Sequence, residues 1–275
     1  MSPLGTRLPS NSEPPSVAPI GLESPVFIGL LGSFVLLKAG HPVVVRTGGK
    51  VESLLSELAL GSHLGIDQGE LLAAVWPTAE TTSASHSFHT LLYSLHHQFA
   101  DVLAGHAPIV RIGGRYRLNV ERGVGVDINA FEAAADAGDA AHRRGDRTTV
   151  AVAFARAVVI YRGDLTVGED VRHLLHRERL RMRYLTLQAT LAEYLFADGD
   201  YRAALAKSLD LLLHDPCRED AHRLVIRCHV RLGERAQALR QFQVCRRILL
   251  GEFEAEPEPA TIALYEQVRR NPAAI

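Results

Sequence analysis

The sequence is poor in cysteine, has almost no net charge and contains no long apolar run. Its 275 residues include 3 cysteines without CxxC spacing, so we expect free thiols and a reducing, cytoplasmic location. The formal net charge of −1 argues against a broadly basic protein that binds nucleic acid regardless of sequence. The longest apolar run, residues 25–37, is interrupted by Gly29 and Gly32 and is too short to cross a bilayer. We therefore expect no membrane partner, and no signal peptide is expected at the amino terminus.

Positive charge is also missing locally, because no Lys or Arg occurs between Lys50 and Arg111. Within this interval, HSFHTLLYSLHHQF (residues 86–99) has the periodicity of an amphipathic helix. One arc is apolar and consists of Phe88, Leu91, Leu92, Leu95 and Phe99. The opposite arc is polar and consists of His86, His89, Tyr93, His96 and His97. The polar side of this helix therefore carries four histidines and no Lys or Arg.

Three segments of different character follow one another along the chain. Residues 1–24 are rich in Pro, Ser and Gly and lack periodicity, which predicts a disordered tail. Residues 25–122 begin with a small antiparallel meander that turns at residues 38–41, and they end with two alternating runs around Gly113-Gly114. Residues 123–272 are rich in Ala, Leu and Arg and predict an all-α domain.

The order of elements in residues 25–122 is that of a winged helix. Between the meander and the hairpin, helices are expected over residues 50–60, 67–76 and 86 to about 103. The second has Asp67 as N-cap with Glu70 three residues later, a capping box. PTAETTSAS (77–85) is typical of a turn-rich connector. The third helix is then the recognition helix, and the hairpin is the wing.

The carboxy-terminal segment contains an internal repeat. FADGDYRAALAKSLDLLLHDP and VRLGERAQALRQFQVCRRIL align with an offset of 34 residues, the period of tetratricopeptide helical hairpins. The offset places Gly199 over Gly233, in tight turns, and Ala204 over Ala238, where helices cross closely. Residues 143–165 predict a further, irregular helical hairpin. Helical arrays of this kind usually present a face to another protein.

Several motifs occur in a specific order: LLAAVWP, VDINAFE (126–132), YRGDL (161–165), and DPCREDAHRLVIRCHVRLGERAQALRQF followed by EFEAEPEPATIALYEQV. Over residues 25–272 the chain resembles SARP-type regulators, the small antibiotic-pathway activators of actinobacteria. These join a response-regulator-type winged helix to a bacterial transcriptional activator domain. The resemblance implies binding to double-stranded promoter DNA, often as a homodimer on direct repeats, and recruitment of RNA polymerase.

The chain departs from this family within the recognition helix. The last turns of that helix usually read like SRLRRKL in the family, whereas residues 93–99 here are YSLHHQF. The apolar positions are kept, and the basic positions hold Ser, His, His and Gln. Because neutralisation of phosphates supplies most non-specific affinity for DNA, this helix is expected to be a weak electrostatic anchor at neutral pH.

Candidate DNA-binding residues lie on the recognition helix, on the wing and before the first helix. They are His86, His89, Thr90, Tyr93, His96, His97, Arg111, Arg115, Arg117, Arg46 and Lys50. On the helix, His, Tyr and Thr would form hydrogen bonds with bases, and the arginines of the wing would contact phosphates or the minor groove. Two alternatives stay open: a solvated helix face without function, and a hairpin whose charges only prevent aggregation.

Other signals give little support to an enzyme, a cofactor or a metal site. The histidine face has no Asp, Glu or Cys nearby to complete a set of metal ligands, and RTGGKV lacks the spacing of a phosphate-binding loop. His173, His176 and Glu178 are expected to form ion pairs on an arginine-rich helical surface. Cys217, Cys228 and Cys245 are expected to pack inside helices of the array.

These observations predict a mainly α fold with a small β component, in which a winged helix precedes a tetratricopeptide-like helical domain. The expected function is that of a sequence-specific DNA-binding transcriptional regulator, an activator that recruits RNA polymerase. The alternative is a protein-interaction module whose winged helix no longer binds DNA. The missing cations of the recognition helix favour this alternative, and the arginines of the wing oppose it.

Overall fold

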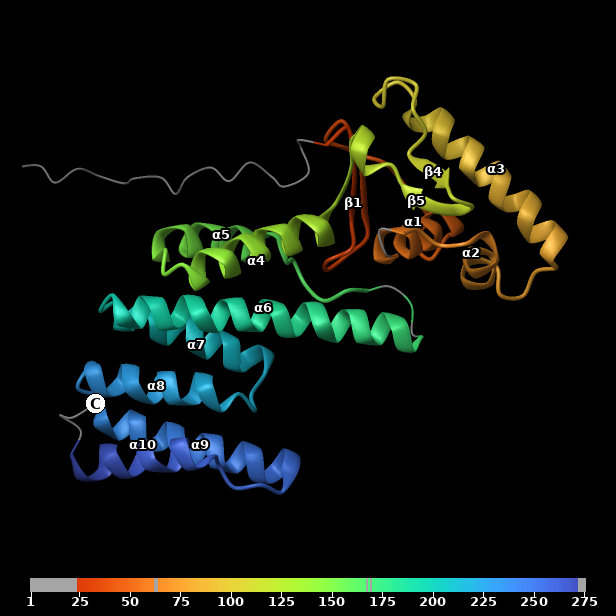
Figure 1. Ribbon diagram of the computed structural model, residues 1–275. Helices are drawn as coiled ribbons and strands as arrows, with labels where there is room; N and C mark the ends of the chain where they lie inside the picture. Colours follow the sequence, from red (N-terminus) through yellow and green to blue (C-terminus); the bar gives the residue numbers. More distant parts are fainter. Residues whose placement is uncertain (1–23, 62–63, 167, 169, 272–275) are drawn as a thin grey trace, which may run out of the picture.

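The computed structural model describes residues 24–61, 64–166, 168 and 170–271. In Figure 1 a small β component and three helices lie at one end of the molecule, and stacked helices make up the rest. The predicted mainly α fold with a small β component is therefore confirmed. The predicted disordered tail lies outside the described residues, except for Ser24.

A four-stranded sheet with the order β3-β2-β1-β6 opens the fold. Its strands are β1 (Val26–Gly29), β2 (Val35–Lys38), β3 (His41–Pro42) and β6 (Val124–Val126). The first three form the predicted antiparallel meander, and the turn at Ala39 and Gly40 has the positive φ values, 47° and 78°, of a two-residue hairpin. β6 pairs in parallel with β1 and was not predicted, because three residues give no readable alternation.

The remaining elements of the winged helix are three helices, a hairpin and a short 3₁₀ turn. They are α1 (Lys50–Leu60), α2 (Gln68–Val75), α3 (Thr81–Phe99), β4 (Ile109–Ile112), β5 (Arg115–Leu118) and η1 (Val120–Arg122). The predicted N-cap of α2 is confirmed, since a carboxylate oxygen of Asp67 accepts a hydrogen bond from the Glu70 N–H at 2.9 Å. Gly113 and Gly114 form the predicted turn of the wing, with φ values of 59° and 84°.

The predicted recognition helix, α3, begins and ends earlier in the sequence than predicted. The interpretation of residues 77–85 as a connector is wrong in its second half, because α3 begins at Thr81. Ala84 is only 2% exposed and extends the apolar stripe by one turn, which holds the neighbouring Thr and Ser residues in the helix. The helix ends at Phe99 and does not continue to about residue 103.

The second half is an array of helices. It comprises α4 (Asp127–Arg143), α5 (Arg147–Ile160), α6 (Val171–Ala197), α7 (Tyr201–His214), α8 (Glu219–Arg231), α9 (Arg235–Phe253) and α10 (Pro259–Arg270). Gly199 and Gly233 adopt φ of 85° and 78° in equivalent turns, and Ala204 and Ala238 are buried, as the repeat predicts. The predicted upstream hairpin exists as α4 and α5, but its first helix lies almost entirely before residue 143.

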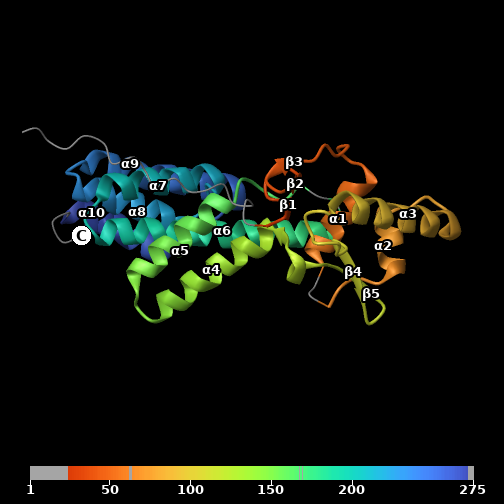
Figure 2. The ribbon, with the colours of Figure 1, turned by 90° about the horizontal axis from the view of Figure 1, so that it is seen from above.

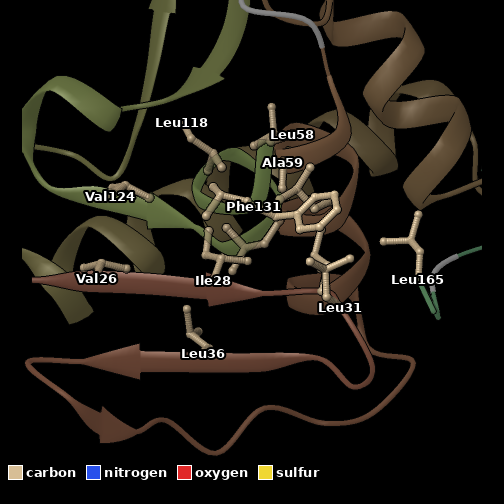
Figure 3. Close-up of a cluster of buried hydrophobic side chains, with 14 of the residues drawn as sticks. Val26, Ile28, Leu31, Leu36, Leu58, Ala59, Leu118, Val124, Phe131 and Leu165 are labelled. Carbon is tan, nitrogen blue, oxygen red and sulfur yellow. The ribbon is translucent and has the colours of Figure 1, made fainter. Parts of the chain in front are cut away.

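One apolar core joins the winged helix to the array. Figure 3 shows Phe131 of α4 among side chains of the sheet, α1 and the loop before α6, including Ile28, Ala59 and Leu165. Next to this core, Asp127 is 1% exposed, and its Oδ2 accepts hydrogen bonds from the N–H groups of Leu30 (2.7 Å) and Leu31 (2.8 Å). Burial raises the pKa of this carboxyl group. The two halves are therefore packed against each other.

His173 lies within ion-pair distance of a neighbouring carboxylate, as predicted, with its Nε2 3.0 Å from Glu57 Oε1. It is only 7% exposed, however, because the start of α6 packs against α1. One prediction about a single side chain is wrong. Cys217 was expected inside a helix, but it lies half-buried in the turn between α7 and α8. Cys228 and Cys245 are buried in helices, as predicted.

Candidate nucleic-acid interface

The packing of α3 determines which of its side chains face solvent. Phe88, Leu95 and Phe99 are at most 1% exposed. The ring of Phe88 meets that of Trp76 edge to face at a centroid distance of 6.3 Å and that of Tyr116 at 4.9 Å. These contacts fix the rotation of α3 about its axis. The predicted polar arc is therefore on the side of α3 opposite this packing. Figures 1 and 2 show α3 itself at the end of the molecule remote from α10.

The outward face of α3 carries no Lys or Arg and has spare hydrogen-bonding capacity. Within the described residues, the imidazoles of His86, His89, His96 and His97 have no hydrogen-bond or ion-pair partner. Tyr93 is 75% exposed, and its ring lies parallel to that of His97 at 6.5 Å. The Thr90 hydroxyl differs, because it donates to the His86 carbonyl oxygen of its own helix at 3.0 Å.

The three arginines of the wing are in different environments. Arg115 and Arg117 alternate on β5 and share one face, whereas Arg111 is paired with Tyr116 across the hairpin and lies on the other face. The Arg111 guanidinium lies 5.5 Å from the ring centroid of Tyr116, which itself contacts α3 through Phe88. Arg111 is thus the arginine of the wing on the side of the recognition helix.

The other two wing arginines are paired with carboxylates, whereas Arg111 donates from Nε to the Gly114 carbonyl oxygen at 3.2 Å. Arg115 donates from Nε to the Gly65 carbonyl oxygen at 2.8 Å and lies 3.5 Å from Glu70. Arg117 pairs with Glu121 at 3.2 Å. Both pairs are partly exposed, so they are weak and a phosphate can compete for the guanidinium groups.

Arg46, which precedes α1, and Lys50, its first residue, also differ from each other. The Lys50 Nζ donates to the Val75 carbonyl oxygen at 2.6 Å and lies 5.8 Å from the centroid of the Trp76 ring, so it closes the carboxy-terminal end of α2. Arg46 is exposed, and its guanidinium has no partner in the described part of the chain. Of the two, Arg46 is the one available to a ligand.

One cation of this region was missed by the sequence analysis. The Lys38 Nζ donates to the Gln98 carbonyl oxygen at 2.7 Å and lies 2.8 Å from Asp101, so β2 holds the carboxy-terminal end of α3. The hydrogen bond from Lys38 lowers the pKa of the Asp101 carboxyl group. The two partners are 60 residues apart in the sequence, and no local pattern could have indicated this contact.

Neither a metal centre nor a reactive thiol is built into the described residues. No group of three or more His, Cys, Asp or Glu side chains is placed to hold a metal ion among them. Burial raises the pKa of Cys228 to about 11 and that of Cys245 to about 12, so both thiols stay protonated. No helix within the described ranges is long and apolar enough to cross a membrane.

Known proteins with similar sequences are regulatory. The family model of the bacterial transcriptional activator domain matches residues 126–269. The regulatory protein AfsR of Streptomyces griseus is 23% identical over 236 residues, which are 86% of this chain and 23% of that protein. AfsR of Streptomyces coelicolor is 23% identical over 269 residues, which are 96% of this chain and 26% of that protein. The chain thus spans about a quarter of the length of these curated relatives.

A solved structure shares the whole arrangement of the two halves. Mycobacterium tuberculosis EmbR, in complex with a low-affinity phosphopeptide, superposes with a TM-score of 0.76 at 22% sequence identity. The match covers 90% of this chain and 66% of that chain. At this level of identity the likeness establishes the fold.

Proposed function

Because the chain belongs to the bacterial transcriptional activator domain family and has the domain order of SARP-type regulators, we propose that it binds promoter DNA in a sequence-specific manner and activates transcription. The family is a regulatory one, and no catalytic activity is part of the proposal. The observation that carries it is the outward face of α3, whose four imidazoles have no hydrogen-bond or ion-pair partner within the described residues while its inward face is packed.

We propose that the residues of the interface have two different roles in DNA binding, contact with bases and contact with phosphates. His86, His89, Tyr93, His96 and His97 would reach base edges in the major groove, where imidazole and phenol groups both donate and accept hydrogen bonds. Arg111, with Arg46, would hold phosphates beside α3, and Arg115 and Arg117 would do so after leaving Glu70 and Glu121. Thr90 and Lys50 would contribute less, because their polar atoms are bonded within the chain.

In this proposal the helical array serves protein contacts. It would support a homodimer on direct repeats and bind RNA polymerase, as the family resemblance implies. Affinity would be modest at neutral pH, since residues 51–110 contribute no permanent positive charge to the interface. Specific contacts without a strong electrostatic background favour discrimination between sequences.

A pull-down of fragmented genomic DNA with the purified protein tests the proposal directly. We expect enrichment of one motif arranged as a direct repeat. His89→Ala and Tyr93→Ala should relax sequence preference. Arg111→Ala should instead weaken binding to every sequence and reduce the slope of log affinity against log salt by about one unit. Arg117→Ala is the matched control, because this residue is paired with the Glu121 carboxylate and should have a smaller effect.

A second candidate function is a protein-interaction module whose winged helix does not bind DNA. The absence of Lys and Arg from residues 51–110 and the pairing of Arg115 and Arg117 with carboxylates favour it. Recovery of no enriched motif, together with identical binding of His89→Ala and wild type to all DNA, would support this candidate and reject DNA recognition.

A further inference from the structure

A pocket of about 380 Å³ lies where α6 packs against α5 and α7 (Figure 1). Its walls are residues 161–164 of the loop after α5, Arg181, Tyr184 and Leu185 of α6, and His214 at the end of α7. Residues 161–164 belong to the motif YRGDL, to which the proposed function assigns no role. Because pockets for small molecules begin at about 300 Å³, this one has the size for a small metabolite.

Contacts within the chain fix the walls of this pocket. The ring of Tyr161 stacks on that of Tyr184 at a centroid distance of 4.3 Å, and its hydroxyl donates to Asp164 Oδ1 at 2.6 Å. The Gly32 N–H donates to the carbonyl oxygen of Asp164 at 3.1 Å, which ties the loop to the amino-terminal half. The pocket is therefore preformed, and this reduces the entropic cost of binding a ligand.

The polar groups of the wall have free hydrogen-bonding capacity. Arg162 donates from Nη2 to Asp127 at 3.3 Å, and its Nε and Nη1 make no hydrogen bond within the described residues. Arg181 donates from Nη2 to the carbonyl oxygen of His214 at 2.6 Å. In the described part of the chain, Asp164 Oδ2 and the His214 imidazole have no hydrogen-bond or ion-pair partner. The pocket thus offers two guanidinium groups to a carboxylate and one carboxylate oxygen to a cation.

The carboxylates around the two arginines offset their charge. Asp127 lies 3.3 Å from Arg162, and Glu178 lies 3.8 Å from Arg181. Asp164 adds one negative charge to the wall itself. The net charge therefore does not favour a simple anion such as phosphate, although both guanidinium groups keep N–H donors for a carboxylate.

Charged residues of α7 and of the turn after it do not reverse this balance. Asp210 interacts with the Lys207 ammonium group. Asp215 and Asp220 both interact with the Arg218 guanidinium, so a small excess of negative charge is left on this side. A ligand that carries an ammonium group as well as a carboxylate matches these surroundings better than a ligand of one sign.

We propose that this pocket binds a free α-amino acid with an aromatic side chain. Its carboxylate would accept hydrogen bonds from Arg162 and Arg181, and its ammonium group would donate to Asp164 Oδ2. Its ring would pack against Tyr184 and His214, whose rings meet edge to face at a centroid distance of 6.2 Å. An α-amino acid carries both charges on one carbon, so it can reach both kinds of group within one small pocket.

The test is isothermal titration calorimetry on the full chain without DNA, so the result does not depend on the proposed DNA binding. Three ligands are compared: L-phenylalanine, 3-phenylpropionate, which lacks the ammonium group, and 2-phenylethylamine, which lacks the carboxylate. We expect L-phenylalanine to bind at least about tenfold more tightly than either of the other two, because each lacks one charge-assisted hydrogen-bonding group.

Asp164→Asn tests the contact with the ammonium group. The new side chain keeps an oxygen that can accept from the Tyr161 hydroxyl, and it loses the negative charge. L-phenylalanine should bind about tenfold more weakly to this variant, whereas 3-phenylpropionate should lose no affinity. Asp136→Asn on α4 is the matched control, since Asp136 is a 69% exposed carboxylate outside the pocket, and it should leave both affinities unchanged.

Arg181→Gln tests the contact with the carboxylate. L-phenylalanine and 3-phenylpropionate should both bind about tenfold more weakly, and 2-phenylethylamine should not. Arg177→Gln is the matched control, because Arg177 also donates to a carbonyl oxygen, that of Leu165 at 2.7 Å, and lies outside the pocket. Circular dichroism verifies that each variant is folded.

Several results would overturn the proposal. Equal affinity for the three ligands, tighter binding of 3-phenylpropionate or 2-phenylethylamine than of L-phenylalanine, or no binding of L-phenylalanine at millimolar concentration would each reject an amino-acid site. Unchanged affinity of folded Asp164→Asn for L-phenylalanine would reject it as well. The three ligands are compared on the wild-type chain, so this part of the test does not depend on how the variants fold.

Discussion

α3 and α6 are both long helices with a polar face, and they use their polar side chains in opposite ways. On α6, Arg179 pairs with Glu132 at 2.6 Å and Arg183 pairs with two carboxylates of α4, so its charges hold the array together. On α3 there is no Lys or Arg, and the imidazoles have no hydrogen-bond or ion-pair partners within the described residues. A polar face that is satisfied internally stabilises a fold, whereas an unsatisfied one is available to a ligand.

The largest effect is expected from Ala238→Leu, which tests whether the stability of the array can change without changing DNA binding by α3. Ala238 is 1% exposed where α9 meets its neighbours, so the larger side chain should reduce the free energy of unfolding by about 1–3 kcal/mol. Ala236→Leu, at an exposed position of the same helix, is the control for helix propensity. Urea denaturation measures both. The DNA affinity of the folded variant should be unchanged. A loss of DNA affinity together with stability would show that α3 depends on the packing of the array.

A smaller effect is expected from Arg183→Ala, which tests the internal role of the α6 charges. The guanidinium bridges Asp136 at 2.6 Å and Asp139 at 2.8 Å, and its side chain is 27% exposed. Its loss should reduce the free energy of unfolding by about 1–2 kcal/mol. His97→Ala, on the unpartnered face of α3, should change it by less than about 0.5 kcal/mol. Equal destabilisation by the two substitutions would contradict the distinction between the faces.

Buried and exposed histidines should also respond differently to pH, and His222 tests the buried kind. Burial lowers the pKa of its imidazole in the folded protein. The unfolded chain therefore binds more protons just below about pH 6.5, and the free energy of unfolding should fall as pH falls through that value. His222→Gln removes this contribution and should flatten the curve. Parallel curves for the two proteins between about pH 7.5 and about pH 5.5 would show that His222 is not held neutral.

The smallest effect concerns the exposed histidines of α3 and refines the proposed interface. An imidazole next to a phosphate gains a proton readily, so DNA affinity should rise as pH falls from about 8 to about 6, with a steeper dependence on salt. Binding isotherms on one operator measure the effect. His96→Gln/His97→Gln should reduce it, and an equal pH dependence in the variant would mean that these two side chains do not face DNA.

Local patterns predicted much of this molecule, and contacts distant in sequence account for what they missed. The apolar stripe from Phe88 to Phe99, the N-cap at Asp67 and the glycine turn of the wing are encoded within a few residues, and they appear as expected. The start of α3 was missed because a single alanine, Ala84, extends the stripe among Thr and Ser residues.

The missed features of the site depend on long-range packing. Lys38 reaches the end of α3 across 60 residues, and His173 becomes buried only because α6 meets α1. The opposite orientations of Arg111 and Arg115 follow from strand register, which a run of arginines in the sequence does not reveal. The interface residues themselves stay a prediction until DNA binding is measured.

The parallel pairing of β6 with β1 has a consequence for synthesis of the chain. Val26 pairs with Val124, and the N–H groups of Leu30 and Leu31 bond to Asp127, which lies 97 and 96 residues further along. At about 5–20 residues per second, a ribosome needs several seconds to release these partners after the first strand has emerged. The sheet thus cannot be completed before β6 and the first residue of α4 leave the exit tunnel, so the amino-terminal half should mature only when synthesis reaches the start of the array.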